Sequence, residues 1–478
     1  MELARYRNRK RRNLALSRMT NARKVALTCQ LTLSHSSASI ASVVDSAFER
    51  HAVDGRERRL INGLVYGVIR WQKQLDWVLD QFINPRFQLD VRHRNILRLG
   101  AFQLLHLDGI PAHAAIFETV QLATSDRRRG NRGRKTAGFI NAVLRSVQRE
   151  GATLTYPQLE THPTEHIAFS LSYPTWLVQR WLQTRGVSWT LAFCRASNQV
   201  APLALRVNTL LTNREDVCQS LAANGIAATA SEIAPDGITF GNRAMTAFDA
   251  AGEKTLKDIL NREDIYVQDE SAMLIPYLLS PTDAKFIVDL CASPGGKTTH
   301  LAHLMRNTGK IVAVDVAAEK IALLKKNCRR IGVRNVETQV MDATKADLRF
   351  MRQADAVLID APCSGFGTLR RHPDIRWNKT AEQIRDLSNI QYNLLKNAAQ
   401  HIKPGGILVY STCSTEPMEN EKVVERFLTD YPMWTVENAQ QFLPEVPPSI
   451  ITPEGFVQTF PHEHGVDGAF AARLRKAV

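Results

Sequence analysis

The chain has 478 residues, and 61 Lys and Arg against 47 Asp and Glu give it a formal net charge of +14 at pH 7. A hydrophobic share of 44% and a charged share of 23% are typical of a globular protein. No apolar run reaches the length of a membrane span, and the basic charge favours a polyanionic partner, most simply nucleic acid. A merely basic protein is the alternative. The length allows about three domains.

Seven cysteines are scattered along the chain without a C-x-x-C spacing. This pattern predicts reduced thiols and a cytoplasmic protein. We expect no metal site, because His462-Glu463-His464 is too closely spaced for a helical zinc pair and is interpreted as a loop. We also expect a monomer with no membrane partner.

Residues 1–24 contain nine Lys or Arg and one acid, Glu2. Such a block is typical of a disordered extension that binds polyanions. It has no apolar stretch of the kind found in secretory signals. An organellar transit peptide and a translation start at Met19 are the alternatives.

Residues 25–159 carry apolar side chains at helical spacing, which predicts an all-helical bundle. Pro85 and Gly109-Ile110-Pro111 mark breaks between helices. A basic stretch at 127–135, with Arg127, Arg128 and Arg129, is expected to be a loop that either contacts RNA phosphates or is simply solvated. The expected helices are Ser42–Glu49, Glu57–Trp71, Leu75–Phe82, Arg92–Leu107, Ala114–Thr124 and Thr136–Gln148.

Residues 160–262 predict a small α+β domain. Its expected elements are helices at Thr164–Phe169, Pro174–Thr184 and Glu215–Asn224, a strand at Leu203–Asn208 and a β-leaning run at Gly237–Phe240.

Residues 263–478 begin with a helix that ends near Leu279, and strands then alternate with helices, which predicts a mostly parallel α/β sheet. The expected strands are Phe286–Cys291, Lys310–Asp315, Val336–Met341, Ala356–Asp360 and Ile407–Ser411, followed by an antiparallel pair near Phe456–Phe460 and Gly468–Leu474.

The turn after the first of these strands runs from Cys291 to Lys297 and leads into a helix near Thr298. A strand, a Gly-rich turn and a helix form the nucleotide site of open α/β sheets. The turn matches neither G-x-G-x-x-G nor the P-loop pattern, so a phosphate cradle is not the first interpretation. A tight turn without a ligand is the alternative.

Asp315, Asp342 and Asp360 end the next strands, at the edge of the sheet where ligands bind. Asp315 is placed to accept hydrogen bonds from ribose hydroxyls. Each acid alone could instead cap the following helix.

Cys363 and Cys413 follow the strands that end at Asp360 and Ser411, where a reactive thiol would be accessible. Chemistry alone does not decide which of the two is a nucleophile. The remaining cysteines outside the Gly-rich turn are interpreted as small buried hydrophobic residues: Cys29, Cys194, Cys218 and Cys328.

Several of these motifs together resemble the RNA cytosine-C5 methyltransferases. The helical region resembles the NusB-like domain of one branch, the bacterial RsmB (Sun/Fmu) small-subunit ribosomal RNA methyltransferases. The resemblance therefore implies a NusB-like bundle, a small α+β domain and a Rossmann-like class I methyltransferase sheet. It rests on Cys291–Thr298, Asp360–Gly365, Arg370–Asp374, Ser411–Ser414 and Glu419–Glu421, and on Ile110–Ala115 and Gly138–Arg145 in the helical region.

The resemblance implies S-adenosylmethionine as the methyl donor and a cytosine C5 of small-subunit (16S) ribosomal RNA as the acceptor. Transfer RNA, another RNA or DNA as the substrate, and a non-catalytic RNA-binding assembly factor, are the alternatives. For the donor, it implies that Asp315 binds the ribose, that Asp342 binds the adenine, that Asp360 lies at the same site, and that the methionine part is held by Cys291, Ala292, Ser293, Pro294, Gly295, Gly296 and Lys297.

For the reaction, the resemblance implies that Cys413 is the nucleophile that adds to C6 and that Cys363 assists product release. Asp360 would hydrogen-bond the cytosine edge. Arg370 and Arg371 would contact RNA phosphates.

Overall fold

The structure is a computed structural model that describes residues 22–36, 38–86, 88–124, 130–240 and 258–478. It divides into two compact units. The first contains the chain up to Asn198 together with His372–Asn378, and the second contains Gln199–Arg371 and Lys379–Val478. Within the described residues, no helix is long and apolar enough to cross a membrane.

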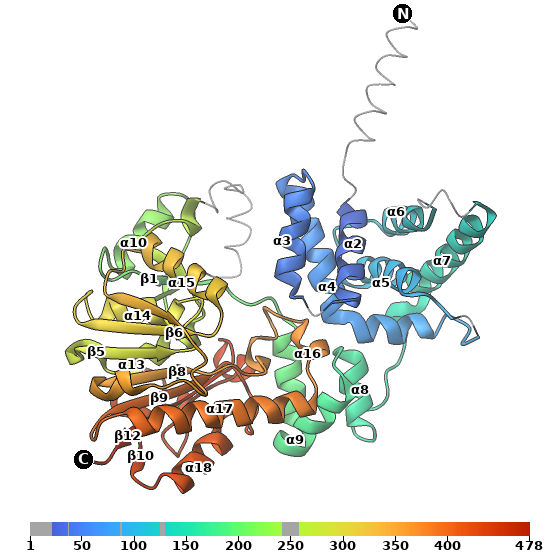
Figure 1. The fold of residues 1–478 in the computed structure, drawn as a ribbon. Helices are drawn as coiled ribbons and strands as arrows, with labels where there is room; N and C mark the ends of the chain where they lie inside the picture. The colour runs from blue at the N-terminus through green and yellow to red at the C-terminus, as the bar shows by residue number, and fades with distance from the viewer. Residues whose placement is uncertain (1–21, 37, 87, 125–129, 241–257) are drawn as a thin grey trace, which may run out of the picture. The chain divides into compact units, whose positions relative to one another are not determined.

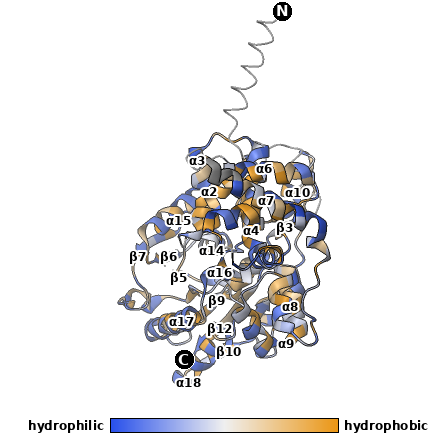
Figure 2. Cartoon of the chain, turned by 90° about the vertical axis from the view of Figure 1, so that its right-hand side faces the viewer, coloured by the Kyte–Doolittle hydropathy of each residue, from blue (hydrophilic) through white to orange (hydrophobic). Residues whose placement is uncertain are grey.

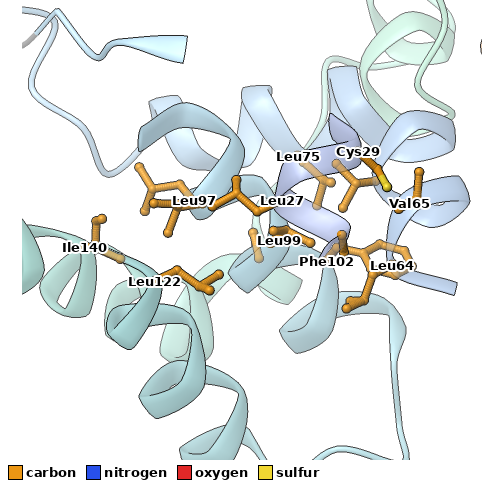
Figure 3. Packing of buried hydrophobic residues seen from close by; sticks show 14 of the residues in the cluster. Leu27, Cys29, Leu64, Val65, Leu75, Leu97, Leu99, Phe102, Leu122 and Ile140 are labelled. Carbon is orange, nitrogen blue, oxygen red and sulfur yellow. The ribbon is translucent and has the colours of Figure 1, made fainter. Parts of the chain in front are cut away.

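The first unit is helical, as the sequence predicted. Its helices carry both hydrophobic and hydrophilic residues (Figure 2), and hydrophobic residues of α2 to α7 pack into one core that includes Leu27, Leu64, Leu99 and Phe102 (Figure 3). The helices are α2 (Ala22–Ser34), α3 (Ile40–Arg50), α4 (Gly55–Asp80), α5 (Val91–His106), α6 (Ala112–Thr124), α7 (Gly130–Glu150), α8 (Pro163–Ser170) and α9 (Thr175–Ser197).

Two expectations for this unit are wrong. Helix α4 is continuous, although the sequence predicted a break between Trp71 and Leu75. The intervening residues are polar but good helix formers, so the apolar pattern breaks while the helix does not. Helix α7 begins at Gly130, inside the stretch 127–135 that was expected to be a loop. Arg127, Arg128 and Arg129 lie outside the described residues.

Helices α8 and α9 belong to the first unit, whereas the sequence placed them in the middle domain. Contacts with α4 explain this difference. The Lys73 backbone N–H donates to Ser172 Oγ at 3.0 Å, and Lys73 Nζ donates to Thr175 Oγ1 at 2.6 Å. The Trp77 ring also stacks on Phe169 of α8 with 6.1 Å between ring centroids.

The segment His372–Asn378, which includes the short helix α16 (Ile375–Asn378), is held in the first unit by two side chains. Arg376 is fully buried, lies over the Tyr173 ring at 3.9 Å, and donates to Asn198 Oδ1 at 2.9 Å. Trp377 Nε1 donates to the Ile69 carbonyl at 2.8 Å.

The second unit contains two sheets. The smaller is antiparallel in the order β2-β3-β1-β4 and is flanked by α10 (Arg214–Ala222). Its strands β2 and β4 were not predicted. The strands are β1 (Ala204–Val207), β2 (Thr229–Ala230), β3 (Gly237–Thr239) and β4 (Ile265–Val267).

The larger sheet has the strand order β10-β12-β9-β8-β5-β6-β7, with β11 paired to β12 (Figure 1). Its central strands are parallel, and β10, β11 and β12 are antiparallel additions. The expected strands and the expected antiparallel pair are confirmed, while β10 was missed. The strands are β5 (Phe286–Leu290), β6 (Lys310–Asp315), β7 (Val336–Val340), β8 (Ala356–Asp360), β9 (Ile407–Thr412), β10 (Trp434–Glu437), β11 (Val457–Thr459) and β12 (Ala469–Lys476).

The strand order reverses at β5, because β6 lies on one side of it and β8 on the other. Ligands of open α/β sheets bind at such a switch point, beyond the carboxyl ends of the strands. The helices of this sheet are α13 (Glu270–Leu278), α14 (Gly296–Leu304), α15 (Ala318–Arg330), α17 (Ala381–His401) and α18 (Glu421–Asp430).

His462-Glu463-His464, expected to be a loop, forms the short helix α19 (Pro461–His464). Pro461 occupies its first turn, where proline is favoured, and His464 Nδ1 accepts a hydrogen bond from the Phe460 N–H at 3.0 Å.

Candidate active site

The Gly-rich turn connects β5 to α14 with two residues in the left-handed region. Cys291 has φ of 62° and Gly295 has φ of 99°. A side chain at Gly295 would also press on Leu324, because a Cβ there would lie 3.0 Å from Leu324 Cγ. Glycine is therefore required at this position, and it lets the chain turn sharply from the strand end into the helix.

The turn is tied to the next strand through Asp315. The Ser293 N–H donates to Asp315 Oδ2 at 3.2 Å, and the Ala317 N–H donates to Oδ1 at 3.4 Å. Asp315 is buried, with Lys320 Nζ 3.8 Å from Oδ1. Asp342, at the end of the neighbouring strand, accepts hydrogen bonds from the Thr344 hydroxyl and N–H, which lower its pKa.

A cavity of about 600 Å³ opens at the carboxyl ends of these strands. It brings most of the predicted donor-site and catalytic residues together, and it adds apolar walls from Val316, Met341, Ile390 and Leu394. The predicted residues that line it are Cys291, Ser293, Lys297, Asp315, Asp342, Asp360, Cys363 and Cys413. Ala292, Pro294, Gly295 and Gly296 complete the turn without lining the cavity.

Lys297 and Asp360 form an ion pair in this cavity, with 2.7 Å between Nζ and Oδ2. Burial disfavours the ammonium, but the charge and hydrogen bond of Asp360 outweigh it and raise the pKa of Lys297. The Ser411 hydroxyl donates to Asp360 Oδ1 at 3.0 Å. Both carboxylate oxygens are therefore held in place.

The two predicted cysteines meet here, with 3.3 Å between Cys363 Sγ and Cys413 Sγ. The hydrogen bond from Cys363 lowers the pKa of Cys413, and the nearby Lys297 ammonium lowers it further. The pKa of Cys363 is raised by the same contact and by its burial. The contact thus favours ionisation of Cys413 over ionisation of Cys363. Of the cysteines expected to be buried, Cys218 is half-buried, and the others are buried: Cys29, Cys194 and Cys328.

Glu419 connects the loop that contains Cys363 to the loop that contains Cys413. It is buried and accepts hydrogen bonds from Ser364 N–H at 2.7 Å and from the hydroxyls of Ser364 and Ser414, each at 2.5 Å. Gln391 Nε2 donates to Glu419 Oε1 at 3.2 Å. The sequence analysis placed Glu419 in a motif but gave it no role, because its partners lie on separate loops.

Gly367 brings a third segment against the Cys413 loop. Its N–H donates to the Cys413 carbonyl at 2.9 Å, and a Cβ there would lie 1.9 Å from the Gly468 carbonyl oxygen. Only glycine permits this approach of three backbone segments.

Asp289, just before the Gly-rich turn, is a buried acid to which the sequence analysis gave no role. It lies inside β5, is fully buried, and accepts from the Thr298 hydroxyl at 2.6 Å through Oδ2. Its Oδ1 has no hydrogen-bond partner among the described residues, and burial raises its pKa to about 7. An acid within an otherwise apolar strand was the signal that could have identified it.

The two arginines predicted to contact RNA are bound to carboxylates. Arg370 is buried and donates to the Gly465 carbonyl at 2.8 Å, with Asp467 at 3.4 Å. Arg371 bridges Asp269 and Asp467 at 2.7 and 2.6 Å. At these positions the two arginines favour a structural role, in which they hold the loop in place, rather than contact with RNA phosphates.

Comparison with known proteins gives three family matches. Residues 276–475 match the model of 16S rRNA methyltransferase RsmB/F, residues 20–149 match the NusB family, and residues 173–245 match the ferredoxin-like domain of RsmF/B-like methyltransferases. The chain is 34% identical to the probable ribosomal RNA small subunit methyltransferase B of Bacillus subtilis (strain 168) over 461 residues, 96% of this chain and 99% of that one. This chain belongs to the RsmB/F methyltransferase family.

Another relative and a solved structure match nearly the whole length of this chain. The probable ribosomal RNA small subunit methyltransferase B of Synechocystis sp. is 34% identical over 463 residues, 96% of this chain and 100% of that one. The solved structure of PH0851 superposes with a TM-score of 0.73 at 28% identity, covering 96% of this chain and 99% of that one. The large sheet is thus the methyltransferase domain of the family, and the small sheet lies largely within its ferredoxin-like domain.

Proposed function

We propose that this chain transfers a methyl group from S-adenosylmethionine to C5 of a cytosine in small-subunit (16S) ribosomal RNA, through a covalent adduct between Cys413 and C6. The observation that carries this proposal is the cysteine pair. Its sulfur atoms lie 3.3 Å apart at the cavity, and their contact lowers the pKa of Cys413 and raises that of Cys363.

The reaction needs such a thiolate because C5 of cytosine is too weak a nucleophile to take a methyl group unaided. Attack by the Cys413 sulfur forms an S–C6 bond and makes C5 carbanion-like. After C5 has gained the methyl group, a base removes the C5 proton, and the S–C6 bond breaks with its electron pair returning to the Cys413 sulfur, which restores the aromatic ring. An ordinary thiol is only a few per cent ionised at pH 7, so the lowered pKa of Cys413 supports its role as nucleophile.

Asp360 and Cys363 take the remaining roles. Asp360, fixed by Lys297 and Ser411, would hydrogen-bond the cytosine edge and support protonation at N3. Cys363 would assist release of the product, as the resemblance to RNA cytosine-C5 methyltransferases implies, and its raised pKa favours its protonated form.

The cavity fits the proposed donor by its chemistry. S-adenosylmethionine supplies a methyl group on a positively charged sulfur, next to an aromatic base and a ribose with two hydroxyls. The turn from Cys291 to Lys297 would hold the methionine part, Asp315 the ribose, and Asp342 the adenine beside the apolar Met341 and Ile390. Behind the turn lies the buried carboxyl group of Asp289, whose Oδ1 has no hydrogen-bond partner among the described residues.

The RNA substrate is inferred from the relatives, which carry the name ribosomal RNA small subunit methyltransferase B. The net charge of +14 supports a polyanionic substrate. The target base must leave its stack to reach Cys413, which costs a few kcal/mol unless it is already unpaired. Arg127, Arg128 and Arg129 are proposed to contact RNA phosphates.

The first test is bisulfite sequencing of ribosomal RNA from cells with and without the gene. We expect one protected cytosine of the small-subunit RNA to become unprotected when the gene is deleted. If it does not change, the same assay on transfer RNA separates a different substrate from a non-catalytic assembly factor.

A second test assigns the two cysteines. Cys413→Ala should abolish methyl transfer from labelled donor, because no thiol then adds to C6. Cys363→Ala should leave a protein–RNA adduct, visible as a slow band on a denaturing gel. The reverse pattern would show that Cys363 is the nucleophile.

A further inference from the structure

Arg206, on β1 of the small sheet, reaches the Gly-rich turn of the methyltransferase domain. Its side chain is fully buried. One guanidinium nitrogen donates to the Gly296 carbonyl and to Gln268 Oε1, each at 2.5 Å, and the other donates to Thr299 Oγ1 at 2.9 Å. Two of these hydrogen bonds join β1 to the first turn of α14, and the third holds the guanidinium to Gln268, just after β4.

The same turn is held at a second point. Asn327 of α15 donates from Nδ2 to the Pro294 carbonyl at 2.8 Å. Tyr266 of β4 lies behind Gly296, since a Cβ there would be 3.5 Å from Tyr266 Cε1. The Tyr266 ring lies between two guanidinium groups, 5.0 Å from Arg206 and 5.4 Å from Arg330. Carbonyls on both sides of Gly295 are therefore fixed by side chains that do not line the donor cavity.

This position is electrostatically unfavourable for an arginine. Its hydrogen-bond partners at the turn are neutral oxygens, and burial lowers its pKa to about 10, so it remains charged at pH 7. A cation in the first turn of a helix also opposes the helix dipole. The planar guanidinium can bond several acceptors in fixed directions, which no apolar residue and no lysine can reproduce.

We propose that Arg206 is a positioning residue for the methyl donor: the small sheet, through Arg206, holds the Pro294–Gly296 turn in the shape that binds the donor. This inference rests on the proposed function. It gives the ferredoxin-like domain a part in donor binding that is separate from any contact with RNA.

The test compares Arg206→Lys with the wild type by calorimetric titration of S-adenosylmethionine into the full chain without RNA. Lysine keeps the positive charge but lacks the planar guanidinium that bonds several acceptors in fixed directions. We expect the donor Kd to rise about tenfold, which corresponds to the loss of about one hydrogen bond to a charged group. In turnover assays, KM for the donor should rise while KM for RNA stays within about twofold.

The matched control is Arg473→Lys. Arg473 is a buried arginine of the same unit that bonds Glu437 and the Leu278 carbonyl. It should lower thermal stability without changing the donor Kd. Hydrogen exchange should quicken at the amides of residues 295–299 in Arg206→Lys and stay unchanged there in Arg473→Lys.

Asn327→Ala keeps the proposal testable if Arg206→Lys does not fold, because Asn327 is only partly buried and holds the same turn. Its donor Kd should rise by a smaller factor. A donor Kd within twofold of the wild type in Arg206→Lys, or in Asn327→Ala if only that variant folds, overturns the inference. So does an equal rise in Arg473→Lys.

The outcomes also separate the two proposals. A wild-type chain that binds the donor but methylates no RNA contradicts the proposed function and leaves the binding test of Arg206 in place. A wild-type chain that binds no donor contradicts both.

Discussion

Cys363 and Cys413 are within hydrogen-bond distance of each other, because their sulfur atoms lie 3.3 Å apart. A hydrogen bond from a thiol stabilises a neighbouring thiolate, so the two pKa values move in opposite directions, down for Cys413 and up for Cys363. The nucleophile is therefore prepared before the substrate binds.

This arrangement predicts a pH effect in the free enzyme. The rate at which iodoacetamide alkylates Cys413 should rise with pH and reach its plateau at a lower pH than for an ordinary thiol. The reason is that the lowered pKa of Cys413 lets the thiolate form at a lower pH. In Cys363→Ala the hydrogen bond is gone, so the pKa of Cys413 should rise and its alkylation at pH 7 should slow. Labelled peptides analysed by mass spectrometry give the rate at Cys413 alone.

Cys218→Ala is the control, since Cys218 is a half-buried cysteine of the small α+β module, on α10. It should leave the profile unchanged. An unchanged profile in Cys363→Ala would mean that Lys297, the other group that lowers the pKa of Cys413, is sufficient.

The sequence predicted the residues at the carboxyl ends of the strands, because strand periodicity alone brings Asp315, Asp360 and the two cysteines to one edge of a sheet. It did not predict the residues behind them. Arg206 bonds Gly296 across 90 residues and Glu419 bonds Ser364 across 55 residues. Such contacts depend on how elements pack, which no local spacing encodes.

Two glycines one turn apart in α4 have opposite surroundings. At Gly67 a Cβ would lie 2.0 Å from Phe102 Cζ, whereas at Gly63 it would meet nothing within 4 Å. Phe102 belongs to α5 and is buried in the helical core. Gly67 therefore permits the close packing of α4 on α5, and Gly63 has no such function.

Substitution by alanine should separate these two cases. Gly67→Ala should destabilise the first unit by about 1–3 kcal/mol, the range for overpacking of a core. Gly63→Ala should stabilise it by up to about 1 kcal/mol, because alanine is the better helix former. Hydrogen exchange of the α4 and α5 amides in the full chain measures both. Equal effects of the two substitutions would contradict the packing argument.

At this scale the sequence predicted elements that carry their own signal. The strands β5, β6, β8 and β9 are apolar runs that end in polar turns, and most helices show a clear period. Strands β4 and β10 are three and four residues long and exist through pairing with β1 and β12, so they gave no such signal. In α4, polar residues at 72–74 were taken for a break, but they bind the α8–α9 region instead.

The charge of the whole molecule predicts salt-dependent RNA binding. Residues 1–21 contain seven Lys or Arg and one Glu. Each phosphate contact adds about 0.7 to the slope of log affinity against log salt for single strands. Deletion of residues 1–21 should therefore make the slope shallower while kcat at saturating RNA stays unchanged.

Filter binding between about 50 and 200 mM salt, where phosphate-driven affinity falls steeply, would measure this slope. A chain in which the same seven residues are replaced by Gln is the control for length. An unchanged slope in both variants would mean that the phosphate contacts lie elsewhere, or that translation starts at Met19.

The chain passes into the second unit after Asn198, returns to the first for His372–Asn378, and leaves it again. A cut at residue 198 therefore does not yield two self-sufficient halves. The fragment 199–478 would keep Arg376 and Trp377 but lose the backbone carbonyls to which they donate. The fragment 1–198 would keep these carbonyls but lose the segment that donates to them. In evolutionary terms, gain or loss of the helical unit at one end of the chain would leave Arg376 and Trp377 without the partners that they bond. Its exchange also requires a matching change just after Arg371, within the sequence motif of the methyltransferase domain itself.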